Sequence, residues 1–264
     1  MLLQRPALIL FAMSKPLQQK VALITGASRG IGKAIAFELA HLGASIMVNY
    51  VRNEEAAVET VTALRDMGSE AHSFQANAGD GADQTLLVDE TFKLFGGVDI
   101  LVHNAAIGAF KPVHKLKPNQ WDLSMTINTR ALLELTQKVL PSMESRGGGS
   151  IIALSSLGSH RFIPNYGAIG ISKAALESLI KYLAVELSPK GIRVNGVSGG
   201  LVDTDAVRHF PEFEKFRDEV VRRTPAGRIG APEDLARVVA FLASPQSAWI
   251  YGQILTADGG LSLI

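Results

Sequence analysis

The chain has 264 residues, of which 47% are hydrophobic, and its formal net charge is +1. A chain of this size can bury a large core, and we expect a single domain. The near-neutral charge gives no case for nucleic-acid binding, and no stretch reaches the roughly 18 apolar residues of a membrane span. The absence of cysteine excludes a disulfide framework, a thiolate metal site and a cysteine nucleophile. We therefore expect a cytoplasmic protein.

Neither metal binding nor export is indicated by the sequence. The six histidines show no metal-ligand spacing, such as a pair four residues apart on a helix, and we expect no metal site. Residues 1–18 are interpreted as an N-terminal extension, with a short apolar run at residues 7–12. No small-residue cleavage site follows this run, and a buried strand is predicted within ten residues of Met13, so we expect no secretion signal.

The first structured segment combines a strand, a glycine-rich turn and a helix. Residues 21–25 are apolar, glycines at G-x3-G-x-G spacing follow from Gly26 to Gly32, and a helical pattern then ends at Gly43. Glycines let backbone N–H groups approach a pyrophosphate closely, and a helix N-terminus adds favourable partial charge. The segment therefore predicts a dinucleotide site, to which we assign Gly26, Ser28, Arg29 and Ile31.

The end of the second predicted strand, residues 44–50, indicates which dinucleotide binds. NAD-binding folds place an acidic residue there for the ribose 2′-hydroxyl, but this chain continues Asn49-Tyr50-Val51-Arg52. Arg52 and Arg29 would each suit a 2′-phosphate, which guanidinium groups bind through paired donors. Either arginine alone is equally explained as a solvated surface residue. Together with the missing carboxylate, they favour NADPH over NADH.

Strand and helix patterns alternate along the rest of the chain, which implies parallel strands joined by right-handed crossovers. Further strands are predicted at 71–76, 99–102, 151–154, 192–197 and 253–256, and further helices at 54–67, 82–95, 121–143, 165–188 and 232–242. The predicted fold is α/β, a Rossmann-type doubly wound sheet of seven parallel strands in one domain, residues 19–264.

Ligands bind at the carboxyl ends of the strands in such sheets. Asn77-Ala78 follows the third predicted strand and Asn104 the fourth, and each polar side chain there either contacts adenine or fixes its turn. Val202 and Thr204 follow the sixth strand and are assigned to the cofactor as well. Residues 205–230 interrupt the alternation with two short helical patches, and we interpret this insertion as a substrate lid.

A tyrosine and a lysine form the candidate catalytic pair. Tyr166 and Lys173 are seven residues apart on a predicted helix, which brings their side chains within about 20° of one direction and about 10.5 Å apart along the axis. A phenol beside a cation is a plausible proton donor, because a positive charge favours the phenolate. Asn128, in the middle of the preceding helix, either bends that helix or holds a water molecule in a proton relay.

These residues carry a family resemblance. In this order they resemble the short-chain dehydrogenase/reductase family over about residues 19–264: Thr25-Gly26-x3-Gly30-x-Gly32, Asn104-Ala105, Asn128, Ser156, Tyr166 and Lys173. Ordinary members have Tyr-x3-Lys, whereas this chain has Ile169 four residues before the lysine. The spacing Tyr166-x6-Lys173 is similar to the divergent enoyl-acyl-carrier-protein reductase branch, and residues 155–159, 182–190 and 197–200 are very similar to its NADPH-dependent type III enzymes.

The resemblance implies NADPH-dependent reduction of the C2=C3 double bond of trans-2-enoyl-acyl-carrier protein in fatty-acid elongation, by a homotetramer or dimer. It implies that Tyr166 binds the thioester carbonyl oxygen and that Lys173 holds the nicotinamide ribose. Ser156 takes the place of the family's catalytic serine and either assists with its hydroxyl or caps a loop. Two alternatives remain, reduction of a 3-oxoacyl thioester and a nonenzymatic NADPH-binding regulator. The intact Asn128, Tyr166 and Lys173 favour an enzyme.

Basic residues on two segments offer a surface for the acidic carrier protein that this activity requires. They are Lys111, His114, Lys115 and Lys117 on one segment and Arg208, Arg222 and Arg223 on the other. Such a surface would attract an acidic partner. Solvated surface charges are the commoner interpretation of the same residues.

Overall fold

The computed structural model describes residues 15–208 and 213–264. The apolar run at residues 7–12, and most of the predicted N-terminal extension, therefore lie outside the described residues. Leu17 belongs to the predicted extension, yet its side chain is buried in the core and its backbone N–H donates to the carbonyl oxygen of Leu42 at 3.0 Å. The folded domain therefore begins earlier than the predicted boundary at residue 19.

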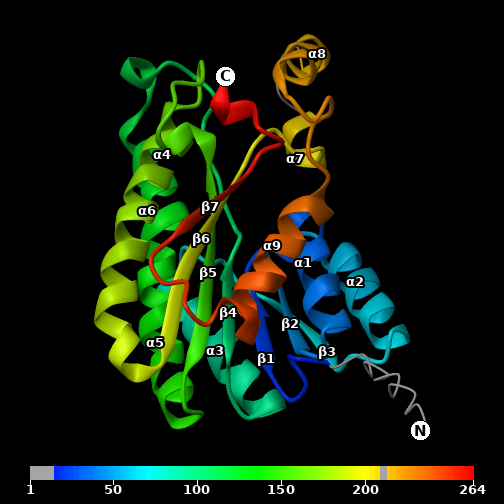
Figure 1. Cartoon of the computed structure of the whole chain (residues 1–264). Coiled ribbons are helices and arrows are strands. Elements are labelled where there is room, and N and C mark those ends of the chain that lie inside the picture. Colours follow the sequence, from blue (N-terminus) through cyan, green and yellow to red (C-terminus); the bar gives the residue numbers. More distant parts are fainter. Residues whose placement is uncertain (1–14, 209–212) are drawn as a thin grey trace, which may run out of the picture.

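Seven parallel strands form one central sheet in the order β3-β2-β1-β4-β5-β6-β7 (Figure 1). The chain reverses its winding between β1 and β4, which confirms the predicted doubly wound topology. The strands are β1 (Val21–Ile24), β2 (Ser45–Tyr50), β3 (Ala71–Gln75), β4 (Ile100–His103), β5 (Gly149–Ser156), β6 (Ile192–Gly199) and β7 (Ile254–Ala257).

Helices cover both faces of the sheet (Figure 1), and successive strand residues point to opposite faces. Ile24 and Val102 belong to the core on one face, and Leu23 and Leu101 to the core on the other. The first core includes residues of α1 (Gly30–His41), α2 (Glu54–Asp66) and α9 (Pro232–Ala243). The second includes residues of α3 (Gly81–Phe95), α5 (Ala131–Ser145) and α6 (Gly167–Leu187).

The predicted insertion lies at the carboxyl end of the sheet, close to the C-terminus (Figure 1). Its two helical patches are α7 (Asp205–Arg208) and α8 (Phe213–Arg223), and residues 209–212 between them lie outside the described residues. A parallel bridge between Val202 and Gly230 closes the base of the insertion. Within the described ranges, no helix is both long and apolar enough to span a membrane.

Candidate active site

The glycine turn after β1 is held by Thr25 and Asn104. The hydroxyl oxygen of Thr25 accepts hydrogen bonds from the backbone N–H groups of Asn104 and Ala105, each at 3.0 Å. The Asn104 side-chain amide donates to the carbonyl oxygens of Thr25 at 3.0 Å and Gly26 at 2.9 Å. Of the two roles considered for Asn104, the structure therefore displays the one that fixes the turn. A Cβ atom on Gly32 would lie 2.3 Å from the Gly26 carbonyl oxygen, so only glycine fits there.

Asn49 is a site residue whose role the sequence did not reveal. It is fully buried near the end of β2, where an NAD-binding fold would carry an acid. Its amide nitrogen donates to the carbonyl oxygen of Ala76 at 2.8 Å, and its amide oxygen accepts from the backbone N–H of Gly26 at 3.3 Å. Asn49 thus joins the glycine turn to the segment after β3. The available signal was a polar side chain directly after the apolar residues 46–48 of this strand.

The start of α1 fits a phosphate group. Arg29 is the N-cap residue, and its side chain does not cap the first N–H groups of the helix. Gly30 has a φ of +56°, and a Cβ atom there would meet only the Thr204 side chain, at 3.5 Å. Ser28 is buried beside this turn, and its carbonyl oxygen accepts from the Thr60 hydroxyl at 3.1 Å. The residues present therefore fit a dinucleotide cofactor, and Thr204 borders the same turn.

The other predicted cofactor residues differ in exposure. Ile31 is half-buried against the core, and Val202 is buried at the base of the insertion. Asn77 is exposed, and its side-chain oxygen accepts from the backbone N–H of Gly79 at 3.0 Å, whereas Ala78 is buried. Asn77 therefore fixes the turn before α3. Arg29 and Arg52 are both exposed, and neither forms an ion pair within residues 15–208 and 213–264.

The paired substitution Arg29→Ala and Arg52→Ala tests the predicted preference for NADPH. Each arginine is expected to bind the 2′-phosphate, and a charged hydrogen bond contributes about 1.5–3 kcal/mol. The dissociation constant for NADPH should therefore rise at least about tenfold, while that for NADH stays close to the wild-type value. Fluorescence titration with each cofactor measures both constants, and Arg237→Ala on α9 is the control. An equal loss for NADH and NADPH would contradict the assignment.

The sequence predicts Tyr166 inside a helix, whereas the structure places it immediately before the helix. The helix α6 begins at Gly167, and Tyr166 is its N-cap residue with a φ of −103°. The chain enters this position through Asn165, whose φ of +61° lies in the left-handed region that asparagine tolerates better than most residues. The Tyr166 carbonyl oxygen accepts from the Gly170 N–H at 2.8 Å. These contacts fix the phenol at the start of α6.

The Tyr166 hydroxyl lies 3.2 Å from the hydroxyl of Ser156, the last residue of β5. The Ser156 hydroxyl also accepts from the Gly158 N–H at 3.3 Å, so Ser156 both contacts the phenol and caps its loop. Burial raises the pKa of Tyr166, and the hydrogen bond with Ser156 acts in the opposite direction. The sequence predicts that the positive charge of Lys173 favours the phenolate, but burial and Ser156 set the pKa of Tyr166 instead. Tyr166 stays protonated at neutral pH and can donate a hydrogen bond.

The backbone comes very close to Tyr166 on one side. A Cβ atom on Gly158 would lie 2.6 Å from the Tyr166 ring, and a Cβ atom on Gly170 would lie 2.5 Å from the Gly158 carbonyl oxygen. The Phe110 ring is tilted against the Tyr166 ring, with the two centroids 6.1 Å apart. Ile169, at the position of the tyrosine of ordinary family members, is buried and contacts Gly108.

Lys173 is 3% exposed, and its ammonium group donates to the Leu154 carbonyl oxygen at 2.5 Å. Burial lowers the pKa of Lys173 to about 8, although the negative charge of Glu177 acts against this shift. His103, at the end of β4, is fully buried. Burial and the charge of Lys173 lower the pKa of His103 to about 3, while backbone contacts at Asn128 and Ile127 act in the other direction. The site thus combines a neutral imidazole with a lysine that is charged below about pH 8.

Asn128 lies in a π-helical segment, Thr126–Arg130, between α4 (Pro118–Met125) and α5. Its amide nitrogen donates to the Ile107 carbonyl oxygen and the Ser172 hydroxyl oxygen, both at 2.8 Å, and its amide oxygen accepts from the Ile107 N–H at 2.8 Å. The predicted continuous helix therefore contains a π segment at Asn128, a common device at functional sites. Asn128 ties the loop after β4 to α6 next to Lys173.

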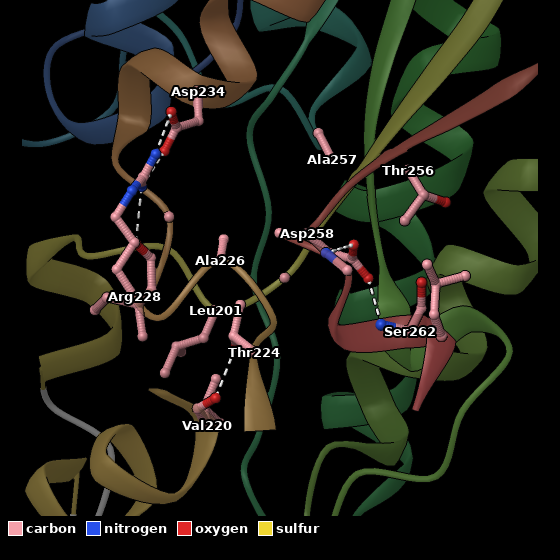
Figure 2. Close-up of a pocket in the computed structure, with 16 residues that line it drawn as sticks. Leu201, Val220, Thr224, Ala226, Arg228, Asp234, Thr256, Ala257, Asp258 and Ser262 are labelled. Atoms are coloured by element: carbon pink, nitrogen blue, oxygen red, sulfur yellow. Dashed lines mark hydrogen bonds and ion pairs between the residues drawn. The ribbon is translucent and has the colours of Figure 1, made fainter. Parts of the chain in front are cut away.

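A cavity of about 490 Å³ opens between the insertion and the C-terminal tail (Figure 2). Figure 2 shows Val220 and Thr224 on one side and Asp258 and Ser262 on the other, with Arg228 directed toward Asp234. Its lining residues do not include Ser156, Tyr166 or Lys173. The three residues that the sequence assigns to the chemistry therefore lie outside the lining of this cavity.

The doubly wound sheet, the turn that fits a phosphate group, the contact between Ser156 and Tyr166 and the similarity to an NADH-complexed structure indicate a nicotinamide-dependent oxidoreductase. Residues 26–262 match the family model described as Enoyl-(Acyl carrier protein) reductase. The chain belongs to the short-chain dehydrogenase/reductase family.

Three similar proteins illustrate the range of this family. The chain is 40% identical to 1-cyclohexenylcarbonyl-CoA reductase from Streptomyces collinus, over 96% of this chain and 92% of the relative. It is 39% identical to dehydrogenase/reductase SDR family member 4 from Sus scrofa, over 93% of this chain and 88% of that relative. A solved 7α-hydroxysteroid dehydrogenase, in complex with NADH and 7-oxo glycochenodeoxycholic acid, has a TM-score of 0.88 and 34% identity, covering 93% of this chain and 96% of that structure.

Proposed function

We propose that the protein reduces the C2=C3 double bond of a trans-2-enoyl thioester on acyl carrier protein, using NADPH, in fatty-acid elongation. The observation that carries the proposal is the position of the phenol. Tyr166 contacts Ser156 from the N-cap of α6, while buried Ile169 occupies the place of the tyrosine of ordinary family members. The spacing Tyr166-x6-Lys173 resembles that of the divergent enoyl reductases.

The displaced phenol suits the geometry of an enoyl thioester. In a ketone, the carbon that accepts hydride also bears the oxygen. In an enoyl thioester, hydride adds to the β-carbon and negative charge develops on a carbonyl oxygen whose carbon is two bonds away. Three residues of helix correspond to about 4.5 Å along the axis, and an offset of this size between positions 169 and 166 suits a carbonyl oxygen that lies farther from the hydride-accepting carbon.

Each site residue then has a defined task. When bound, the nicotinamide cofactor supplies the hydride. Tyr166 donates a hydrogen bond to the thioester carbonyl oxygen and stabilises the negative charge that develops there. Ser156 holds the Tyr166 hydroxyl from 3.2 Å, and Lys173 keeps a positive charge in the buried site below about pH 8.

The Streptomyces collinus relative supports a thioester substrate. The compound in its name is a CoA thioester with a ring double bond next to the carbonyl carbon. Such a compound presents the same conjugated arrangement of double bond and thioester carbonyl as a trans-2-enoyl thioester. We carry this chemistry over to the present chain because the two sequences align over nearly their whole lengths.

A basic loop beside the phenol supports a carrier-bound substrate. Val113 contacts Gly167 at the start of α6, so the loop with Lys111, Lys115 and Lys117 borders the Tyr166 site. None of these three lysines forms an ion pair within the described ranges, and their charges are thus free to attract an acidic carrier protein.

We also propose a homotetramer, or a dimer, as the assembly. Helix α6 exposes apolar side chains along one face, with Tyr182 at 68% and Val185 at 74% exposure. Trp249, in the loop before β7, is 96% exposed. Exposed aromatic and aliphatic side chains of this size are typical of protein interfaces.

Reduction of a 3-oxoacyl thioester is the second candidate, because the paired hydroxyls of Ser156 and Tyr166 would also polarise a ketone. Rates of NADPH oxidation with crotonyl-acyl-carrier protein and acetoacetyl-acyl-carrier protein separate the two. We expect kcat/KM to be at least about tenfold higher for the crotonyl substrate, a difference of about 1.4 kcal/mol in transition-state binding. A faster acetoacetyl reaction would favour the carbonyl reductase, and cofactor binding without either reaction would favour a regulator.

A further inference from the structure

A carboxylate on α6 holds the loop that contains Ser156. We call residues 155–160 the Ser156 loop. Oε1 of Glu177 accepts hydrogen bonds from the hydroxyls of Ser155 at 2.5 Å and Ser159 at 2.6 Å. Oxygen–oxygen distances near 2.5–2.7 Å are typical of hydroxyls bonded to an ionised carboxylate. One carboxylate oxygen therefore fixes the loop on both sides of Ser156.

The Ser159 hydroxyl has a second possible acceptor in Ser156. The hydroxyl oxygen of Ser159 lies 2.8 Å from the Ser156 carbonyl oxygen, and the His160 ring nitrogen Nδ1 lies 3.0 Å from the same hydroxyl. A serine hydroxyl carries one hydrogen, so it can donate to Glu177 or to Ser156 at any moment, and the charged acceptor forms the stronger bond. The bond therefore goes to Glu177, and the carboxylate acts on Ser156 through the bonded hydroxyls of Ser155 and Ser159 rather than through the Ser156 carbonyl oxygen.

The same carboxylate faces the catalytic lysine. Lys173 and Glu177 are four residues apart on α6, which places their side chains on one face of the helix. The other titratable groups around Lys173 carry little charge at neutral pH. His103 on β4 has a pKa of about 3, and burial raises the pKa of Tyr166 at the helix start. Glu177 is thus the negative group that acts on Lys173, and it favours the charged lysine.

We propose that Glu177 is a positioning residue, whose carboxylate holds the Ser156 loop through Ser155 and Ser159 and supplies the negative charge that faces Lys173. The proposal rests on the assignment of Ser156, Tyr166 and Lys173 to the reaction. It applies equally to reduction of a double bond and of a carbonyl group. Glu177 acts only through these neighbours and does not touch the substrate.

The substitution Glu177→Gln separates the two effects, because its amide oxygen still accepts from the serine hydroxyls but carries no charge. Loss of a nearby opposite charge shifts a pKa by about one unit or more. We therefore expect the alkaline limb of the kcat/KM profile to move about one unit lower, with an activity loss of about fivefold at pH 8. Glu177→Ala also removes the acceptor, and its kcat should be lower than that of Glu177→Gln at every pH.

Two control variants and a direct measurement complete the experiment. Glu186→Gln removes an exposed carboxylate from the same helix, and His160→Asn removes the titratable ring of the loop, so neither should move the alkaline limb. NMR of ¹⁵N-labelled lysine side chains in the free protein, assigned with Lys173→Arg, reports the titration of Lys173 without turnover. It should occur at lower pH in Glu177→Gln than in the wild type.

Unchanged Lys173 titration and an unchanged alkaline limb in Glu177→Gln would overturn the electrostatic part of the proposal. Equal kcat values for Glu177→Ala and Glu186→Gln would overturn the positioning part. These outcomes are distinct from failure of the proposed function. If the wild type does not reduce crotonyl thioesters while the Lys173 titration still moves in Glu177→Gln, the role of Glu177 stands and the substrate assignment is wrong.

Discussion

The Tyr166→Phe variant is expected to lose turnover by about 10²–10³-fold, the usual effect of removing one hydrogen-bond donor to a developing oxyanion. The substitution removes the hydroxyl that contacts Ser156 and leaves the ring in its place beside Gly158 and Phe110. Binding of NADPH should therefore change little. Single-turnover and steady-state rates with crotonyl-acyl-carrier protein measure the first effect, and fluorescence titration measures the second.

Tyr182→Phe is the matched control for this variant. Tyr182 is on the same helix, but it is 68% exposed and lies outside the site, so its substitution should leave turnover unchanged. Wild-type turnover in Tyr166→Phe would show that another group stabilises the carbonyl oxygen. The assignment of the donor, and with it the proposed mechanism, would then be wrong.

The Lys173→Met variant is expected to lose both turnover and cofactor affinity. It removes the buried ammonium group that lies at the end of β5, where the sequence resemblance places the nicotinamide ribose. A hydrogen bond to a charged group contributes about 1.5–3 kcal/mol, so the dissociation constant for NADPH should rise at least about tenfold. Cofactor titration measures this change. Unchanged affinity together with reduced turnover would place Lys173 away from the cofactor.

Unfolding as a function of pH provides an independent test of Lys173. Its pKa is about 8 in the folded protein, against 10.5 for an ordinary lysine. Below pH 8 both states are protonated, whereas between these two values the unfolded chain binds more protons and stability rises with pH. The lysine should therefore add up to about 3 kcal/mol to the free energy of unfolding over this range, a rise that Lys173→Met lacks. If the wild type and Lys173→Met show the same change in the free energy of unfolding between about pH 8 and pH 10.5, this expectation is contradicted.

The alternation of strands and helices could be predicted because it depends on local periodicity. The strands β5 and β6 nevertheless extend two residues beyond their predicted ends. Ser155 pairs with Ser198 and Ser156 with Gly199 in the parallel register. Backbone pairing requires no apolar side chain, so polar residues continued these strands without an apolar signal. The extension is what places Ser156 beside Tyr166.

Residue identity in the site was easier to predict than residue contacts. Periodicity cannot fix the first residue of a helix, and Tyr166 proved to be the N-cap residue behind a left-handed Asn165. Asn104 and Asn128 each had two interpretations, and only their distant backbone partners showed which groups they hold. Glu177 gave no signal at all, because a charged residue on a helix usually faces solvent.

The close approach between Gly158 and Gly170 leaves the backbone beside Tyr166 little room to move. Only the Cα hydrogen atoms of the two glycines fit between the Ser156 loop and the first turn of α6, so these two segments are packed together as one rigid unit. Neither segment can move outward for a bulkier substrate or inward for a smaller one. Under the proposed function, discrimination between acyl groups of different length would then depend on residues outside this contact.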